Sequence, residues 1–347
     1  MSEGIRAAVI GCGDISALHL AAISSHENAS LVALSDIDPG RLAVAADVHG
    51  VPGFADHLQL LDEIRPDVVH ICTPHNTHAA LAIDALDRGI SVVLEKPVAH
   101  TRDEATRLME AASRSSARIA VCFQNRYNAP VQAAFEILSS GAAGQVTGAA
   151  ATVIWHRSPE YYQDRPWRGR WSTGGGGLLM NQAIHTLDLV QWLVGPVVKV
   201  RGSASTRLLD DVIEVEDTAE MVLTHESGAR SVFYTTLAHV ANAPVSLEIV
   251  AEKATLSLRG DLTIAWADGR RETVSERALP TGERAYWGVS HELLIADFYA
   301  HLDDGGAFWI DPEEARKSLD IIQDVYDQSY PERAGRTETT TERKTLT

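Results

Sequence analysis

The segment spanning residues 11–16 constrains the fold of this chain more than any other. It reads Gly-Cys-Gly-Asp-Ile-Ser, the pattern G-x-G-x-x-G with serine at the third glycine position. A strand is expected before it, over residues 6–10, and a helix after it, over 17–23. The first two glycines permit a tight turn and close backbone approach to a pyrophosphate, which the helix N-terminus stabilises. The pattern alone is weak evidence, but a strand before it and a helix after it strengthen the case.

A carboxylate after the second predicted strand indicates which dinucleotide this loop would hold. Asp36 follows the strand expected over residues 31–35. A carboxylate there accepts hydrogen bonds from ribose hydroxyls and repels a 2′-phosphate, which favours NAD over NADP. Helix capping is the competing explanation, but Asp38 and Pro39 already supply an N-cap and a first helical residue. In the loop itself, the residues expected to contact the dinucleotide are Gly11, Gly13, Asp14 and Ile15.

Strands and helices alternate over the first part of the chain. Apolar runs predict further strands over residues 67–72, 90–94 and 118–123, with helices between them. This alternation predicts a doubly wound parallel sheet, the Rossmann arrangement. Open sheets of this kind bind ligands at the carboxyl ends of their strands, so polar residues that follow these strands are site candidates.

Two polar clusters follow strands of the predicted sheet. Residues 73–78 suit a nicotinamide-side ribose, although loop capping would explain Asn76 and Thr77 by themselves. In Glu95-Lys96-Pro97, the proline restricts Lys96 to an extended or turn conformation at the sheet edge. A lysine held there can donate to a substrate hydroxyl and exchange a proton with it, whereas a strand that merely ends in a charged residue is the plainer explanation. The cofactor contacts expected from the two clusters are Thr73, Pro74, Asn76, His78, Glu95 and Lys96.

Length and composition bound the class of protein. A chain of 347 residues predicts two domains, 1–123 and 124–330, followed by a polar, threonine-rich tail over 331–347 that is expected to be disordered. The formal net charge of −17 argues against nucleic acid or an anionic membrane as a partner. The three cysteines lack ligand-like spacing, so neither disulfides nor a metal site is expected, and the reducing cytoplasm fits best. Because no secretory h-region or long apolar run is apparent, secretion and membrane insertion are not expected.

The pattern changes after Tyr127. A helix is expected to begin near Pro130 and end near Ser140, and helices over 290–303 and 312–330 are expected to close the chain. Runs of period 2 lie between them, at 147–155, 197–207, 215–223, 229–237, 245–250, 254–258 and 262–266. They predict an α/β domain with a mostly antiparallel sheet, one face of which can pack on helices or on another subunit.

A polar stripe lies on an otherwise apolar helix expected over residues 178–194. Asn181, His185 and Asp188 are spaced i, i+4 and i+7 and therefore share one face of that helix. Three buried polar side chains need hydrogen bonds to one another or to a ligand. A satisfied core network is the plain alternative. The glycine run at 174–177, which lets backbone approach a bound molecule, favours an active site.

Together these features resemble the glucose–fructose oxidoreductase and inositol dehydrogenase family (Gfo/Idh/MocA). The features are the glycine pattern followed by His19, Glu95-Lys96-Pro97, Asn125-Arg126, and the glycine-rich segment that leads to His185 and Asp188. The resemblance covers nearly the whole chain except the tail. It implies NAD(P)-dependent oxidation or reduction of a sugar, sugar acid or cyclitol at a secondary alcohol. It also implies a cofactor contact from Asn125 and an open sheet that forms a homodimer or homotetramer interface.

The resemblance further implies roles for individual side chains. The family's catalytic lysine corresponds to Lys96 and its histidine to His185, whereas its aspartate corresponds to Asn181, which cannot ionise. We therefore expect His185 to take the hydroxyl proton, with Asp188 or a backbone carbonyl fixing its tautomer, while Lys96 stabilises charge on the same oxygen. Asn181 then only orients the substrate. Arginines near the expected pocket suggest a substrate carboxylate or phosphate, although solvated loop arginines are commoner. The expected substrate contacts are Tyr162, Trp167, Arg168, Asn181 and His185, with Arg170 nearby.

Two other functions stay open at the level of sequence. NAD-dependent glycoside hydrolysis through transient oxidation resembles a side branch of the same family, and it would cleave a glycoside without net NADH. A dinucleotide-sensing regulatory protein without turnover is the other. The presence of Lys96 and His185 argues against a sensor, whereas Asn181 keeps that alternative open.

Overall fold

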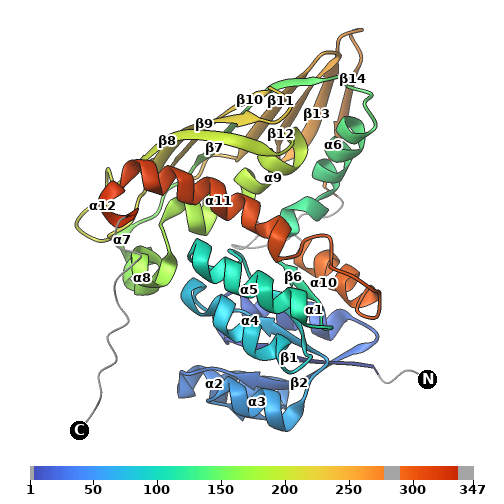
Figure 1. Ribbon diagram of the computed structural model, residues 1–347, viewed down its shortest axis with the longest axis vertical. Coiled ribbons are helices and arrows are strands. Elements are labelled where there is room, and N and C mark those ends of the chain that lie inside the picture. The colour runs from blue at the N-terminus through green and yellow to red at the C-terminus, as the bar shows by residue number, and fades with distance from the viewer. Residues whose placement is uncertain (1–3, 277–289, 335–347) are drawn as a thin grey trace.

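The computed structural model describes residues 4–276 and 290–334, which form two sheets (Figure 1). The strands of the first sheet are β1 (Ile5–Ile10), β2 (Ala29–Ser35), β3 (Gly53–Phe54), β4 (Val68–Ile71), β5 (Ser91–Leu94) and β6 (Ile119–Val121). They are parallel and lie in the order β3-β2-β1-β4-β5-β6. This is the doubly wound order of dinucleotide-binding folds, so the predicted Rossmann sheet is confirmed. The two-residue β3 was not predicted, because so short a strand shows no periodicity.

Helices connect these strands, and local capping explains where several of them begin. They are α1 (Ser16–Ser25), α2 (Pro39–His49), α3 (His57–Ile64), η1 (His75–Thr77), α4 (His78–Leu86) and α5 (Arg102–Arg114). As predicted, the Asp38 side chain caps α2 by accepting hydrogen bonds from two backbone N–H groups. Strands β4 and β5 are buried along their whole length, which accounts for their continuous apolar sequence.

The second sheet is mostly antiparallel. Its strands are β7 (Val146–Ile154), β8 (Val197–Ser205), β9 (Thr218–His225), β10 (Arg230–Thr236), β11 (Ser246–Ala251), β12 (Ala254–Arg259), β13 (Asp261–Trp266) and β14 (Arg271–Val274). They lie in the order β14-β13-β12-β11-β7-β10-β9-β8, in which β7 and β10 pair in parallel. The predicted open sheet is confirmed, and β14 is an addition to it.

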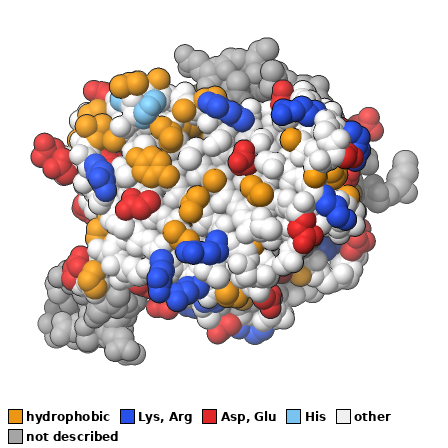
Figure 2. Space-filling model, turned by 90° about the horizontal axis from the view of Figure 1, so that it is seen from above, with side chains coloured by type: hydrophobic (Ala, Val, Ile, Leu, Met, Phe, Trp, Pro, Cys, Tyr) orange, Lys and Arg blue, Asp and Glu red, His pale blue; other side chains and the backbone are white. Residues whose placement is uncertain are grey.

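Helices lie on one face of the second sheet, and no helix among the described residues covers its other face. Those against the sheet are α6 (Ala129–Ser139), α9 (Ile184–Val194) and α11 (Pro312–Ser329), all below it in Figure 1. On the opposite side Val232 and Tyr234 are exposed, whereas the alternate residue Phe233 is buried. Seen from above, hydrophobic side chains are spread across that face of the molecule, with charged side chains between and around them (Figure 2).

The last helices return to the first sheet. Helix α10 (Ser290–Ala300) packs on α1, and α11 packs on α5 as well as on β8 (Figure 1). The backbone N–H of Val121 in β6 donates to the carbonyl oxygen of Ile310. The predicted tail begins instead with a helical turn, α12 (Pro331–Ala334), and residues 335–347 lie outside the described residues. Among the described helices, none combines the length and apolar character needed to cross a membrane.

Candidate active site

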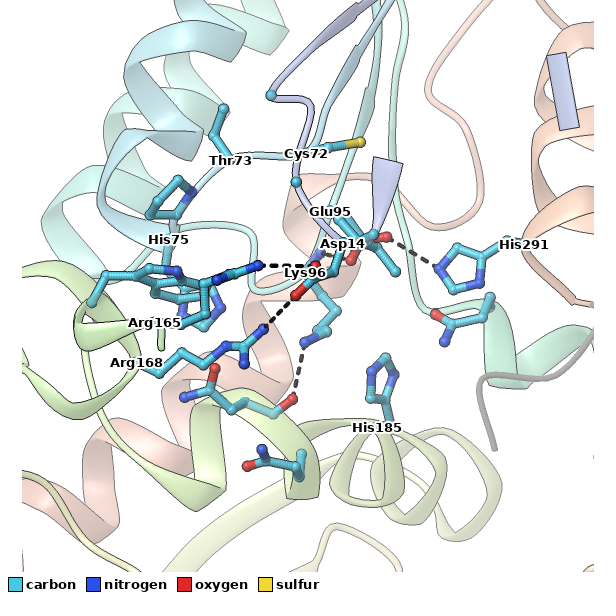
Figure 3. Close-up of a pocket in the computed structure, with 18 of the residues that line it drawn as sticks. Asp14, Cys72, Thr73, His75, Glu95, Lys96, Arg165, Arg168, His185 and His291 are labelled. Atoms are coloured by element: carbon cyan, nitrogen blue, oxygen red, sulfur yellow. Dashed lines mark hydrogen bonds and ion pairs between the residues drawn. The ribbon is translucent and has the colours of Figure 1, made fainter. Parts of the chain in front are cut away.

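A cavity of about 1830 Å³ opens at the carboxyl ends of β1, β4 and β5, and its far wall comes from residues after 123 (Figure 3). Short helices supply much of that wall: η2 (Gln124–Tyr127), α7 (Pro159–Gln163), η3 (Pro166–Gly169), α8 (Trp171–Gly174) and η4 (Leu179–Ala183). The cavity brings most of the predicted site residues together: Gly11, Gly13, Asp14, Ile15, Asp36, Thr73, Pro74, Asn76, Glu95, Lys96, Asn125, Trp167, Arg168, Asn181 and His185.

Two predicted site residues, His78 and Tyr162, do not line this cavity. The buried ring of His78 lies between backbone carbonyls, with Nδ1 2.7 Å from Pro97 O and Nε2 3.0 Å from Thr73 O. It therefore ties two loops together, and the cofactor role expected of it has no support from its position. Tyr162 is buried in the core, and its neighbour Tyr161 faces the cavity instead. Similarly, His75 lines the cavity and His78 does not. This difference was not predicted, because sequence alone does not orient the side chains of a short helical turn.

The glycine loop fits a dinucleotide. At Gly11, where φ is +94°, a Cβ would lie 2.6 Å from the carbonyl oxygen of Cys72, so no larger residue fits without a backbone shift. At Gly13 a Cβ would meet nothing within 4 Å, so the backbone there is open to an incoming group. The Asp36 carboxylate accepts hydrogen bonds from the N–H groups of Cys12 and Asp38, each at 2.7 Å, and lines the same cavity. These residues present the turn and the carboxylate that an NAD pyrophosphate and ribose require.

Lys96 spans the cavity from the end of β5. Its Nζ donates a hydrogen bond to the main-chain carbonyl oxygen of Asn181, at 3.0 Å (Figure 3). Burial lowers the pKa of Lys96, since a desolvated ammonium is less stable than one in water. One of the three ammonium protons is thereby engaged, which leaves two for groups bound in the cavity.

His185 faces Lys96 from the helix on the opposite wall. The helix begins with the π-helical turn η4 and continues as α9. Burial, and next the charge of Lys96, hold the pKa of His185 well below its ordinary value of 6.5. Its buried Nδ1 has no hydrogen-bond partner in the part of the chain that the structure describes. A neutral imidazole with an unpaired nitrogen is the form that can accept a proton.

Asp188 does not line the cavity. The predicted polar stripe of Asn181, His185 and Asp188 is therefore wrong for Asp188. Its carboxylate accepts two hydrogen bonds from the guanidinium of Arg126, at 2.8 and 2.5 Å. Both side chains are 1% exposed, and Arg126 also binds Glu314 at 2.9 Å. A buried guanidinium needs such partners, so the carboxylate of Asp188 is engaged by Arg126. Asp188 therefore does not fix the tautomer of His185.

Comparison with known proteins identifies the kind of protein that carries this site. Residues 5–123 match the model of an oxidoreductase family with an NAD-binding Rossmann fold, and residues 131–257 match the GFO/IDH/MocA C-terminal domain. The chain belongs to the Gfo/Idh/MocA oxidoreductase family. It is an NAD-dependent enzyme, as predicted.

Members of this family with known names resemble the chain along most of its length. The D-apiose dehydrogenase of Paraburkholderia graminis is 27% identical, over 92% of this chain and 86% of its own. The inositol 2-dehydrogenase of Rubrobacter xylanophilus is 28% identical, over 74% of this chain and 72% of its own. Among solved structures, the WlbA dehydrogenase of Bordetella pertussis, in complex with NADH and UDP-GlcNAcA, is 30% identical over 97% of this chain and 98% of its own, with a TM-score of 0.81.

Glu216 is a buried residue of this family member that the sequence did not single out. Its carboxylate accepts hydrogen bonds from the N–H groups of Gly177 (2.9 Å) and Leu179 (2.8 Å) and from the hydroxyl of Tyr326 (2.8 Å). It thus holds the start of the helix that carries His185. Burial raises the pKa of Glu216 to about 7. The sequence predicts a strand over 215–223 that includes Glu216, whereas β9 begins only at Thr218. No local pattern therefore distinguishes Glu216 as a residue that holds the helix.

Two arginines on the far wall, Arg165 and Arg168, lie beside the same carboxylate. Arg165 and Arg168 lie 3.1 and 3.6 Å from the carboxylate oxygens of Asp14, a predicted cofactor contact (Figure 3). Arg168 also lies over the ring of Tyr161, at 4.4 Å from its centre. Arg170 is exposed and does not line the cavity, contrary to expectation. Because Arg165 and Arg168 face Asp14 and Arg170 lies outside the cavity, these arginines give little support to an anionic substrate.

A cluster of possible metal ligands lies under the site, although none was expected. Ligand atoms of His19, Glu95 and His291 lie within 4.8 Å of one another. Each imidazole Nε2 is 3.1 Å from Glu95 Oε1, which is hydrogen-bond distance. Hydrogen bonds therefore account for the cluster.

Proposed function

We propose that this enzyme transfers hydride between NAD and a secondary alcohol or ketone of a sugar, sugar acid or cyclitol, with Lys96 and His185 as the catalytic pair. The observation that carries the proposal is the bond from Lys96 Nζ to the carbonyl oxygen of Asn181, at 3.0 Å, which brings the lysine to the helix of the neutral His185. The names of its relatives, D-apiose dehydrogenase and inositol 2-dehydrogenase, support the substrate class.

The roles follow from the protonation states of the two side chains. His185 accepts the hydroxyl proton as the alcohol is oxidised, and Lys96 donates a hydrogen bond to the same oxygen as negative charge develops on it. Asn181 orients the substrate without taking a proton. When bound, the nicotinamide supplies the hydride acceptor. Gly11, Gly13 and Asp36 hold the other end of the dinucleotide, and Asp36 selects NAD over NADP.

A polyhydroxylated substrate suits the polar far wall. The amide nitrogen of Gln182 donates to the hydroxyl of Tyr161 at 2.9 Å. Its buried Oε1 has no partner among the residues described, although the residue lines the cavity. A buried acceptor of this kind needs a donor, and a sugar hydroxyl provides one.

We place the boundary between the cofactor and substrate domains at residues 123 and 124. Helices α10 and α11, although later in the chain, pack back on the cofactor domain.

We further propose a homodimer or homotetramer that pairs the open face of the second sheet. Val232, Tyr234 and Val250 are 52%, 42% and 42% exposed on that sheet, and a hydrophobic sheet face gains stability from a second copy. Light scattering after size-exclusion chromatography tests this, and a monomer at micromolar concentration contradicts it.

Cys12, Cys72 and Cys122 are free thiols, which supports a reducing cytoplasmic location.

The experiment is a screen of sugars, uronates and cyclitols for NADH formation by its absorbance. We expect at least one compound to give NADH with NAD as oxidant, and much less with NADP. Cleavage of a glycoside without net NADH would indicate the hydrolytic alternative. Tight NAD binding with no turnover on any compound would indicate a sensor.

A further inference from the structure

A buried chain of hydrogen-bonding side chains ends at Glu95, directly before Lys96. Tyr299 OH lies 2.7 Å from His70 Nε2, and His70 Nδ1 lies 2.9 Å from His19 Nδ1. Glu95 Oε1 is 3.1 Å from His19 Nε2 and 3.1 Å from His291 Nε2. All five residues are at most 5% exposed. The mechanism above uses none of these groups, so their arrangement needs its own explanation.

The network assigns a donor or acceptor role to every nitrogen in it. Although burial opposes ionisation, hydrogen bonds from His19 and His291 hold the pKa of Glu95 well below its ordinary value. An ionised carboxylate only accepts, so both Nε2 atoms donate to it. His19 Nδ1 is then an acceptor, which requires His70 Nδ1 to donate and His70 Nε2 to accept from Tyr299. In the tautomer of His291 that donates to Glu95 from Nε2 alone, the other nitrogen, Nδ1, carries a lone pair and no proton.

That nitrogen is buried beside the cavity without a donor. His291 is 4% exposed and lines the cavity, and no residue in the described ranges donates a hydrogen bond to its Nδ1. The ring lies beside Glu95, away from Arg165 and Arg168 (Figure 3). Leaving a buried acceptor unpaired costs stability, so a site of this kind favours a ligand that brings a donor.

The placement of His291 indicates which ligand group is the donor. Glu95 follows β5 and Thr73 comes shortly after β4, the strand ends at which doubly wound sheets hold the nicotinamide half of a dinucleotide. Glu95 also binds His19 of α1, the helix after the glycine loop, so the acceptor is fixed to the cofactor sheet. Among the described residues, the side chain of His291 makes one hydrogen bond, which is to Glu95. It makes none to the helix that carries His185. Of the groups on a nicotinamide ring, the carboxamide carries the N–H donors.

We propose that His291 is a cofactor-binding residue whose Nδ1 accepts a hydrogen bond from the carboxamide N–H of bound nicotinamide. Glu95 holds the imidazole in the tautomer that makes this possible. The bond fixes the rotation of the nicotinamide ring relative to Lys96. His291 thus binds the nicotinamide end of NAD, whereas the glycine loop and Asp36 bind the other end.

Binding measurements with a dinucleotide analogue test this without relying on turnover. In 3-acetylpyridine adenine dinucleotide, a methyl group replaces the carboxamide nitrogen, so the donor is lost. By calorimetric titration we expect the wild-type protein to bind NAD about 10-fold more tightly than the analogue, the scale of one hydrogen bond to a buried group. Equal affinities for the two dinucleotides would overturn the proposal.

Two variants separate the two nitrogens of His291. His291→Gln can place its amide N–H where Nε2 donates to Glu95, but it puts no acceptor at the position of Nδ1, so it should bind both dinucleotides about equally. His291→Asn keeps an acceptor near the position of Nδ1 and should retain most of the preference for NAD. ADP-ribose, which lacks nicotinamide, should bind all three proteins alike and reports whether the variants are folded. A full preference for NAD in His291→Gln contradicts the proposal.

A spectroscopic measurement on the wild-type protein covers the case in which His291→Gln does not fold. In protein labelled with ¹⁵N-histidine, the Nδ1 resonance of His291 should shift when NAD binds and stay in place with ADP-ribose. No shift with NAD overturns the proposal. A shift that requires an added sugar or cyclitol overturns it too, because the donor is then a substrate hydroxyl.

Discussion

The ammonium group of Lys96 donates a hydrogen bond to the main-chain carbonyl oxygen of Asn181, with 3.0 Å between the two atoms. The bond joins the end of β5 to the helix that carries His185. Because the acceptor belongs to the main chain, this link does not depend on the side chain at position 181. The Asn181 amide binds the carbonyl oxygen of Gly177 instead, also at 3.0 Å. An asparagine in place of the family's aspartate therefore leaves Lys96 where it is.

This geometry predicts different losses at positions 181 and 185. His185→Ala removes the proton acceptor and should lower kcat by about 100-fold to 10,000-fold. Asn181→Ala leaves the bond to Lys96 intact and should raise KM by about 10-fold, with a smaller loss in kcat. Steady-state kinetics on the substrate found by the screen provide both parameters. The division of roles is wrong if the two variants lose kcat equally.

The preference for NAD should depend on the charge of Asp36. Asp36→Ala removes the carboxylate that would face a 2′-phosphate, so the affinity for NADP should rise by about 10-fold while that for NAD falls. Asp38→Asn is the control, because it removes a nearby charge and keeps the cap of α2. Titration of each protein with both dinucleotides measures the effect. Equal wild-type affinities for NAD and NADP would show that Asp36 has another purpose.

The raised pKa of buried Glu216 should make the stability of the protein depend on pH. Its pKa is about 7 in the folded protein, above the ordinary 4.5 of an unfolded chain. The folded state thus binds this proton more tightly, and the stability that protonation contributes is complete below pH 4.5 and lost as the pH rises toward 7. Relative to Glu216→Gln, which does not titrate, the wild-type protein should lose about 2 kcal/mol in unfolding free energy between about pH 5 and pH 8.

Urea unfolding at the two pH values measures this difference. The exposed Glu220, on strand β9, offers a matched control. Glu220→Gln should change the unfolding free energy by no more than about 0.5 kcal/mol at either pH, because substitutions at exposed positions have small effects. A difference between wild type and Glu216→Gln that does not vary with pH contradicts the account of Glu216.

Residues that directly follow a strand were predictable from sequence. Gly11, Asp36 and Lys96 each come immediately after an apolar run or one residue beyond it, and the carboxyl ends of parallel strands meet at one edge. The local pattern of the chain is therefore enough to place these residues together. The alternation of strands with helices predicts the parallel first sheet, and the period-2 runs predict the mostly antiparallel second sheet.

Residues that reach the site through tertiary packing were not predictable. His291 and Glu216 come from elements far along the chain, and their partners, Glu95 and Gly177, are brought to them only by folding. Asp188 was misassigned for a different reason. Its spacing from His185 is that of a regular α-helix, since both residues lie in α9, but Arg126 binds its carboxylate. Periodicity identifies a polar position, but the buried charges around it decide its partner.

The measurement that tests the central claim most directly is NADH formation by Lys96→Met, together with its affinity for NAD. Methionine keeps much of the length of the side chain and removes the ammonium that faces substrate. NAD should bind with little change, since the proposed contacts of Gly11, Gly13 and Asp36 are at the other end of the dinucleotide. We predict that turnover falls by at least ~100-fold, the scale for losing a proton-transfer or charge-stabilising group. Unchanged turnover in Lys96→Met would contradict the assignment of this cavity as a Lys96–His185 active site.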